Sequence, residues 1–390
     1  MLLYALSNGI QYIGYNCVPL VITDQSFSND ATVGFSTAIG AVFTIIAQFF
    51  WGRIADRSRS KNRILVLVLI GMSLSAVPFL FSIPSKAALY IYMALFYFFF
   101  LTPQSMVDTI CIENLHKTKK PFGLIRTASP GLGVLLALSM LLFPGLTAKR
   151  MILIFILCPL LAIIPTLLLP NTAGHGRITK DRPREKGAVL KLLKNKRLLL
   201  LLAFGLFGCT FGNIPTTYFP VYYSTESGLN AGTSMLGAFF AIAIFLEVCV
   251  LIVGTKLVKK LNPYIILAIL LLTNAVRMFL IFIIQDPSLM LVTTILQAFW
   301  FGMMFSVATP LIYSIVPPEY SATGQSMWVL TAFGIAQILS NLLSGVLANL
   351  MPIRYIFLVS ALGFVVLFFI LGPLYLKQAR EDRKLSAGIR

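Results

Sequence analysis

The chain has 390 residues, of which 58% are hydrophobic and only 11% are charged, and its formal net charge is +18. An ordinary soluble domain has about 25% charged residues, so this composition argues against a soluble enzyme, a nucleic-acid-binding protein and a disordered scaffold. Continuous apolar runs of about 20 residues predict α-helices that cross a bilayer. We expect an all-α integral membrane protein with twelve spans, at approximately 2–21, 32–51, 64–84, 87–108, 123–144, 151–169, 198–221, 232–254, 263–284, 289–315, 324–348 and 355–376.

Basic residues predict how these spans are oriented. Of the 31 Lys and Arg residues, 25 fall on one side of the predicted bundle and four fall on the other. Because cytoplasmic loops carry the excess of Lys and Arg, we expect both termini in the cytoplasm and the protein in the cytoplasmic membrane. The first span starts at residue 2 with no basic stretch or cleavage site before it, which indicates a retained helix and not a removed signal peptide.

A single long polar segment divides the spans into two groups of six. We expect an N-terminal bundle at 1–169, a basic cytoplasmic linker at 170–197, a C-terminal bundle at 198–376 and a cytoplasmic tail at 377–390. Gly52 and Arg57 recur 202 residues later as Gly254 and Lys259, again at the end of the second span of a half. This coincidence favours a duplication, and paired halves are the usual organisation of secondary transporters.

A polar motif follows the second span, where residues 52–63 read GRIADRSRSKNR. It resembles the signature loop of the major facilitator superfamily, which implies twelve helices in two pseudo-symmetric bundles. Gly52 permits a tight turn or a close helix approach, and Asp56 can accept from backbone N–H groups or pair with an Arg. The resemblance implies that Gly52, Asp56 and Arg57 act as a conformational gate. The alternative is a generic basic cytoplasmic loop.

A second motif, FGLIRTASPGLG at 122–133, opens the fifth span. It resembles a stretch of the lactose-permease and nucleoside-symporter branch of the superfamily, in which an acid on helix 4 pairs with this Arg at the substrate site. By position, the resemblance implies that role for Asp108 and Arg126. Ser129 and Pro130 depart from the glycine pattern. The alternative is that both charges are interfacial, because both lie near the cytoplasmic ends of their spans.

Glu247 and Arg277 lie among apolar residues in the eighth and ninth spans. An unpaired charge inside a membrane costs several kcal/mol, so we expect a partner and a function. Their heights differ by roughly 8 Å at 1.5 Å per residue, which two long side chains or a water can nearly bridge. The resemblance implies that Glu247 binds substrate or passes a proton and that Arg277 tunes the proton site. A static ion pair is the alternative. The tenth span departs from the permease pattern because 296–304 has no titratable group, so Glu247 or Asp108 would carry protons.

The implied fold builds its cavity from helices 1, 4, 7 and 10, with help from 5, 8 and 11. Polar and aromatic residues of these helices are the candidates for substrate binding: Tyr12, Tyr15, Asn16, Gln104, Asn213, Tyr218, Gln297, Trp300, Gln325 and Trp328. Neutral amides and aromatic rings suit sugars and nucleosides, by hydrogen bonding and stacking, and suit amphipathic drugs nearly as well. Each residue has an alternative interpretation as an interface anchor or a bond to a neighbouring helix.

The predicted function is transport of a small neutral polar solute by alternating access, coupled to protons. The alternative is proton-driven efflux of amphipathic compounds. A membrane enzyme or sensor is a third possibility, but no nucleophile–base set, metal motif or long soluble domain supports it. The sequence has no G-x-x-x-x-G-K-[ST] loop for ATP. We expect a small-molecule substrate, protons and the lipid bilayer as partners, with no cofactor, no nucleic acid and a monomeric state.

Overall fold

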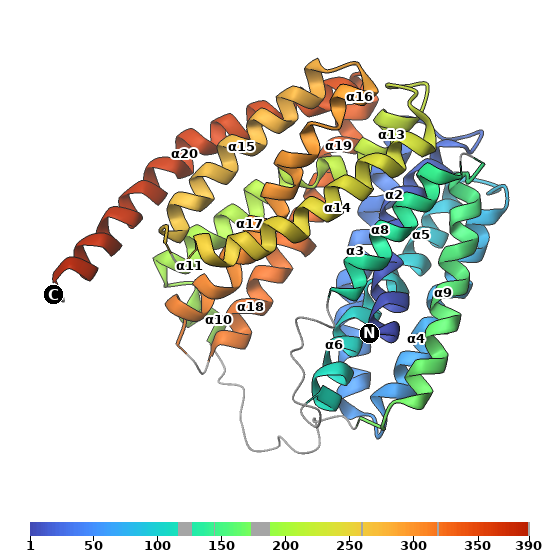
Figure 1. The fold of residues 1–390 in the computed structure, drawn as a ribbon, viewed down its shortest axis with the longest axis horizontal. Coiled ribbons are helices and arrows are strands. Elements are labelled where there is room, and N and C mark those ends of the chain that lie inside the picture. Colours follow the sequence, from blue (N-terminus) through green and yellow to red (C-terminus); the bar gives the residue numbers. More distant parts are fainter. Residues whose placement is uncertain (116–126, 144, 173–187, 259, 318–319, 389–390) are drawn as a thin grey trace. The chain divides into compact units, whose positions relative to one another are not determined.

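The computed structural model describes the chain except for residues 116–126, 144, 173–187, 259, 318–319 and 389–390. Every regular element among the described residues is helical (Figure 1), as the continuous apolar runs predict. The chain divides into two compact units, which are described separately below. Unit 1 comprises Met1–Pro183 and Thr216–Ala241, and unit 2 comprises Arg184–Pro215 and Ile242–Arg390.

Unit 1 holds the first six predicted spans. Its helices are α1 (Leu2–Tyr4), η1 (Ala5–Gly9), α2 (Gln11–Thr23), α3 (Asp30–Arg57), α4 (Lys61–Ala76), η2 (Val77–Leu80), α5 (Lys86–Phe100), α6 (Thr102–Leu115), α8 (Ala128–Leu142) and α9 (Ala148–Leu168). It also holds most of α13 (Ile214–Ser224) and the start of α14 (Gly232–Leu257). The sequence places Thr216–Ala241 in the C-terminal bundle, whereas these residues cluster with unit 1. One of their contacts there is the hydrogen bond of 3.3 Å that the Thr233 hydroxyl donates to the Leu146 carbonyl.

Unit 2 holds the remaining elements. They are α10 (Ala188–Leu192), α11 (Lys196–Ala203), η4 (Phe204–Gly208), α12 (Cys209–Gly212), α15 (Pro263–Ile283), α16 (Pro287–Met290), α17 (Thr293–Ile315), α18 (Ser321–Val329), η6 (Leu330–Ile335), α19 (Ala336–Leu350) and α20 (Ile353–Gly388), together with the rest of α14. Within this unit α15 packs along both α20 and α17. These contacts bury one face of α15, and that face carries Asn274 and Arg277.

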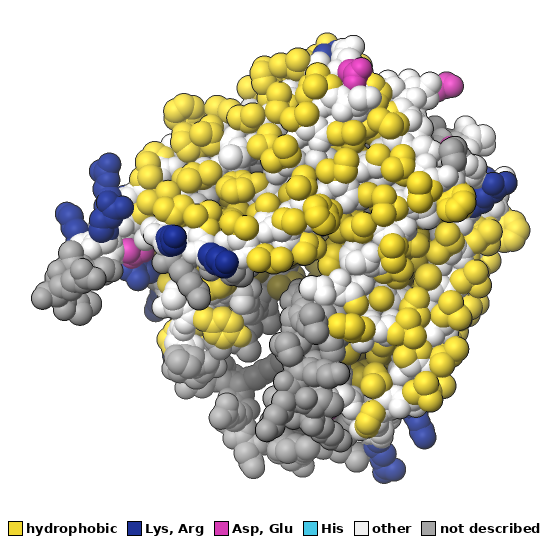
Figure 2. Space-filling view, viewed as in Figure 1, with side chains coloured by type: hydrophobic (Ala, Val, Ile, Leu, Met, Phe, Trp, Pro, Cys, Tyr) yellow, Lys and Arg dark blue, Asp and Glu magenta, His cyan; other side chains and the backbone are white. Residues whose placement is uncertain are grey.

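The membrane-spanning character predicted from the sequence is confirmed, with a qualification on number. Ten helices among the described residues are long and apolar enough to cross a membrane. The described part of the fifth predicted span is α8, since residues 123–126 and 144 lie outside the described residues, and the first span is divided into α1, η1 and α2. Large apolar side chains such as Phe49, Leu168 and Phe369 are 68%, 80% and 71% exposed, and hydrophobic side chains cover much of the face in Figure 2. An apolar surface of this extent suits lipid and not water.

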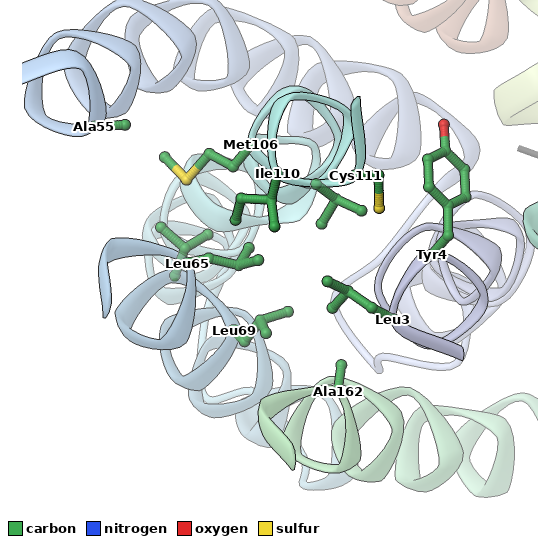
Figure 3. Packing of buried hydrophobic residues seen from close by; sticks show 11 residues of the cluster. Leu3, Tyr4, Ala55, Leu65, Leu69, Met106, Ile110, Cys111 and Ala162 are labelled. Atoms are coloured by element: carbon green, nitrogen blue, oxygen red, sulfur yellow. The ribbon is translucent and has the colours of Figure 1, made fainter. Parts of the chain in front are cut away.

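A cluster of buried residues joins five helices of unit 1 (Figure 3). Its members are Leu3, Tyr4, Ala55, Leu65, Val68, Leu69, Met106, Val107, Ile110, Cys111 and Ala162. Lipid is as apolar as these side chains, so close packing stabilises such a cluster more than removal from water does. The cluster fixes α1 against α4, α6 and α9, and Figure 3 shows the Tyr4 hydroxyl directed away from it. The cluster therefore positions a buried polar atom.

Candidate functional site

A π-helical turn interrupts the first span of each sequence half. Ala5–Gly9 forms this turn in unit 1, and Phe204–Gly208 forms it in unit 2. A π turn carries one residue more than the regular ladder accommodates, and such turns are frequent at functional sites. In both spans a proline follows inside the outer helix, Pro19 in α2 and Pro220 in α13. Both first helices of the halves are therefore irregular at matching places.

In unit 1 the π turn packs closely on α8. A Cβ on Gly9 would lie 2.8 Å from the Leu132 Cβ. One turn away, a Cβ on Gly133 would come within 2.5 Å of the Tyr12 ring. Glycine at these two positions lets the two helices approach, as small residues do in membrane interfaces. The contact places the Tyr12 ring directly over α8.

The predicted binding residues of the first span lie on α2 and are partly buried. The Tyr15 ring meets the Phe100 ring edge-on at 5.0 Å, and the Asn16 amide donates to the Tyr12 carbonyl at 2.7 Å. Asn8, within the π turn, is 4% exposed, and neither atom of its amide has a partner among the described residues. A buried amide without a bond is costly, so Asn8 is a further candidate for solute contact.

Asp108 lies on α6 and accepts a hydrogen bond of 2.7 Å from the Tyr4 hydroxyl. Tyr4 is 2% exposed. Arg126, its predicted partner, lies outside the described residues, so the Asp108–Arg126 pair stays a prediction. Gln104 is partly buried one turn before Asp108. Sequence reasoning missed Tyr4, because a Tyr at the end of a span is as often an interface anchor.

In unit 2 the π turn of the seventh span packs on a second one, η6. A Cβ on Gly205 would lie 2.8 Å from the Trp328 ring and 3.4 Å from the Ala332 Cβ. The Asn213 amide donates to the Ala332 carbonyl at 3.4 Å. Gln325 is partly buried, one turn before Trp328. Asn213 follows α12 in the seventh span, and Gln325 and Trp328 lie on α18 in the eleventh. Three predicted binding residues therefore come from the two spans that meet at these turns.

The two charged residues inside the spans of unit 2 are not joined to each other. Arg277 is 2% exposed, and its Nη2 donates to Gln297 Oε1 at 2.6 Å. Its Nε and Nη1 have no partner among the described residues. Glu247, partly buried on α14, makes no side-chain hydrogen bond or ion pair with the described part of the chain. Gln297 on the adjacent α17 takes the position that the sequence suggested for Glu247.

Two predicted binding residues are fully buried. The Trp300 ring packs between Phe204 at 5.4 Å and Phe364 at 5.5 Å. The Tyr218 hydroxyl accepts from the Gly34 N–H at 3.1 Å and donates to the Asp30 carbonyl at 2.8 Å. Both side chains are 0% exposed. In this conformation they contribute to packing, and contact with a solute would require a rearrangement.

The proposed gate residues lie at the end of a helix and not in a loop. α3 continues through Arg57, so only Ser58–Ser60 connect it to α4. A Cβ on Gly52 would meet no described atom within 4 Å, so the close approach expected there is absent. Arg57 is exposed in the last turn, where a cation interacts favourably with the helix dipole. The side chain of Asp56 lies outside the described residues.

Beside this motif, Asn62 joins α4 to the end of α9. It is 5% exposed. Its Nδ2 donates to the carbonyls of Thr166, Leu169 and Pro170 at 3.0, 3.3 and 3.3 Å, and its Oδ1 accepts from the Thr172 N–H at 3.2 Å. Sequence reasoning missed Asn62, since an Asn at a helix start is indistinguishable from an ordinary surface residue. The proline at 170, which leaves a helix carbonyl without its donor, is the signal that was present.

The chain is similar to known transporters over nearly its whole length. The Bacillus subtilis (strain 168) protein described as uncharacterized transporter YwbF is 22% identical over 376 residues, 94% of this chain and 90% of that protein. The crystal structure of the nucleoside transporter NupG superposes with a TM-score of 0.78 at 14% identity, covering 96% of this chain and 98% of that chain. A bacterial homolog of the human lysosomal transporter Spinster, inward-facing and unoccupied, gives 0.73 at 15% identity, covering 97% and 98%.

At these identities the structural likenesses show the fold, which is that of major facilitator transporters. The match to a family model is independent of them. The model described as the MFS_1 like family matches residues 20–359, well over half of the chain. Together with the ten apolar helices found among the described residues, these findings show that this protein is a multi-pass membrane transporter that belongs to the MFS_1-like family.

Proposed function

We propose that this transporter moves a small neutral polar solute, of the sugar or nucleoside class, across the cytoplasmic membrane by alternating access. The supporting observation is the chemistry around the two π turns. Neutral amides and aromatic rings lie there: Asn8 and Tyr12 in unit 1, and Asn213, Gln325 and Trp328 in unit 2. Amide side chains can form hydrogen bonds with the hydroxyl groups of a solute, and aromatic rings can stack on its faces. The likeness of the fold to the nucleoside transporter NupG favours the nucleoside class.

Proton coupling is the second part of the proposal, with Glu247 as the proton carrier. Glu247 is a carboxyl group inside a span with no described partner, and an ionisable group in that position is a candidate proton carrier. Asp108, Arg126 and Arg277 then tune the charge of the cavity. Gly52, Asp56 and Arg57 form the cytoplasmic gate of a monomer whose termini both lie in the cytoplasm.

Transport by the purified protein in proteoliposomes tests this proposal. We expect uptake of at least one labelled sugar or nucleoside, and we expect accumulation above equilibrium only when the outside is more acidic. Uptake that is unchanged when the pH gradient is collapsed would refute the coupling but not the substrate class. Thermal stabilisation by hydrophobic cations and by no sugar or nucleoside would refute the substrate class and favour the efflux antiporter.

A further inference from the structure

The buried face of α15 carries polar groups whose bonding capacity is largely unused. Arg277 and Asn274 lie one turn apart and are 2% and 1% exposed. Arg277 Nη2 donates to Gln297, but Arg277 Nε and Nη1 have no described partner. The amide nitrogen and oxygen of Asn274 also have no described partner. Buried polar side chains in folded proteins almost always find partners. A cluster with this many unused atoms indicates bound water or a ligand.

The neighbouring helix α17 adds another unused donor, one turn along from the residue that Arg277 contacts. α15 and α17 are consecutive spans joined by a short connection, and they pack together as an antiparallel pair. Arg277 contacts Gln297. One turn back along α15 is Asn274, and one turn forward along α17 is Trp300, so both steps lead toward the same end of the pair. The Trp300 indole N–H is buried and also lacks a described partner.

The balance of these groups identifies the class of ligand. The unused atoms are two nitrogens of the guanidinium, one amide nitrogen and one indole nitrogen, against a single acceptor oxygen on Asn274. Among the described residues, no carboxylate lies within 4.0 Å of Arg277. A buried cation without a counter-charge is strongly unfavourable. Water would satisfy the donors but would leave the positive charge uncompensated.

We propose that a small monovalent anion of the chloride class binds between α15 and α17. Arg277 Nε and Nη1 and Asn274 Nδ2 donate to it, and the unpartnered Trp300 indole N–H is a further candidate donor. A single negative charge matches the single guanidinium, whereas sulfate or a phosphate dianion would reverse the imbalance. This site does not depend on the identity of the solute, because it follows from the charge and burial of Arg277, a residue that the proposed proton coupling also uses.

Anion-specific stabilisation of the purified full-length protein tests the site. Unfolding temperatures are compared in sodium chloride, bromide, acetate and gluconate at one ionic strength and pH. We expect saturable stabilisation by chloride and bromide over gluconate, and loss of that difference in Arg277→Gln. The matched control is Arg354→Gln, which removes the same charge from unit 2 but from a side chain that bonds the Phe282 carbonyl. The control should retain the halide effect.

Bromide diffraction supplies a readout that does not depend on a folded variant. We expect an anomalous peak within hydrogen-bond distance of Arg277 Nε or Nη1 in the wild-type protein, and a several-fold weaker halide affinity in Asn274→Leu, which keeps the guanidinium. No peak at Arg277, or equal halide stabilisation in Arg277→Gln and wild type, would overturn the proposal. Stabilisation by acetate and not by halide would also overturn it, since the site would then take a carboxylate.

Discussion

Replacing Asn62 by Ala should destabilise unit 1 strongly, because this amide completes the end of α9. Residue 170 is proline and has no N–H, so the carbonyl of Thr166 lacks its helical donor, and Asn62 Nδ2 supplies one at 3.0 Å. Its Oδ1 also accepts from the Thr172 N–H. Thr172 is 3% exposed, so the variant leaves buried backbone groups unsatisfied. At about 1–3 kcal/mol for each such group, we expect a total loss of about 2–4 kcal/mol.

A thermal-unfolding series in detergent measures this loss. At about 2–4 °C per kcal/mol for a unit of this size, Asn62→Ala should lower the unfolding temperature by roughly 5–15 °C. The matched control is Asn171→Ala, at the same junction, because Asn171 is exposed and its amide makes one bond of 3.4 Å to the Arg59 carbonyl. A shift for Asn62→Ala no larger than that of Asn171→Ala would refute the assignment of a structural role to these bonds.

Two further predictions concern transport. Glu247→Gln should retain solute exchange at equal concentrations but lose accumulation driven by a pH gradient, because the amide cannot take up a proton; full accumulation in this variant would make Glu247 structural. Gly133→Val should destabilise the protein by about 1–3 kcal/mol and slow uptake, since its Cβ would come within 2.5 Å of the Tyr12 ring. Gly131→Val is the control, because a Cβ there meets no described atom within 4 Å. Equal uptake by these two glycine variants would contradict the close packing of η1 on α8.

The spans were predictable because lipid imposes a simple rule on them. In lipid, the backbone N–H and C=O groups must bond within the segment and the side chains must be apolar, so an apolar run of sufficient length predicts a helix. The long helices follow the apolar runs. The end of α3 was not predictable by that rule. Residues 52–57 look like a loop because they are polar, yet they continue the helix to Arg57, since polarity marks the water boundary and helix hydrogen bonds do not stop there. The family's motif therefore lies partly on a helix.

Side-chain pairing inside the bundle was harder to predict than the bundle itself. The sequence shows which charges are buried, as it does for Arg277, but a charge can be met by any polar group at its own height. Gln297 on α17 accepts a hydrogen bond from one guanidinium nitrogen of Arg277. A search for opposite charges does not find this partner, because its amide is neutral. Tyr4 and Asp108 illustrate the same limit, because their sequence separation of 104 residues is closed only by the packing of α1 on α6.

The two halves share the backbone conformation of the π turn in their first spans but not its side chains. Ala5–Gly9 and Phe204–Gly208 occupy matching places in the first spans, but their sequences, ALSNG and FGLFG, agree only in the final glycine. The buried amide of the first turn, Asn8, corresponds to Phe207, which is 49% exposed. Since the backbone irregularity repeats and the side chains do not, we infer that both halves need the irregularity itself. A π turn loosens the helix ladder locally. In the proposed transport cycle this would let the first helix of each half bend, while its side chains differ between the halves.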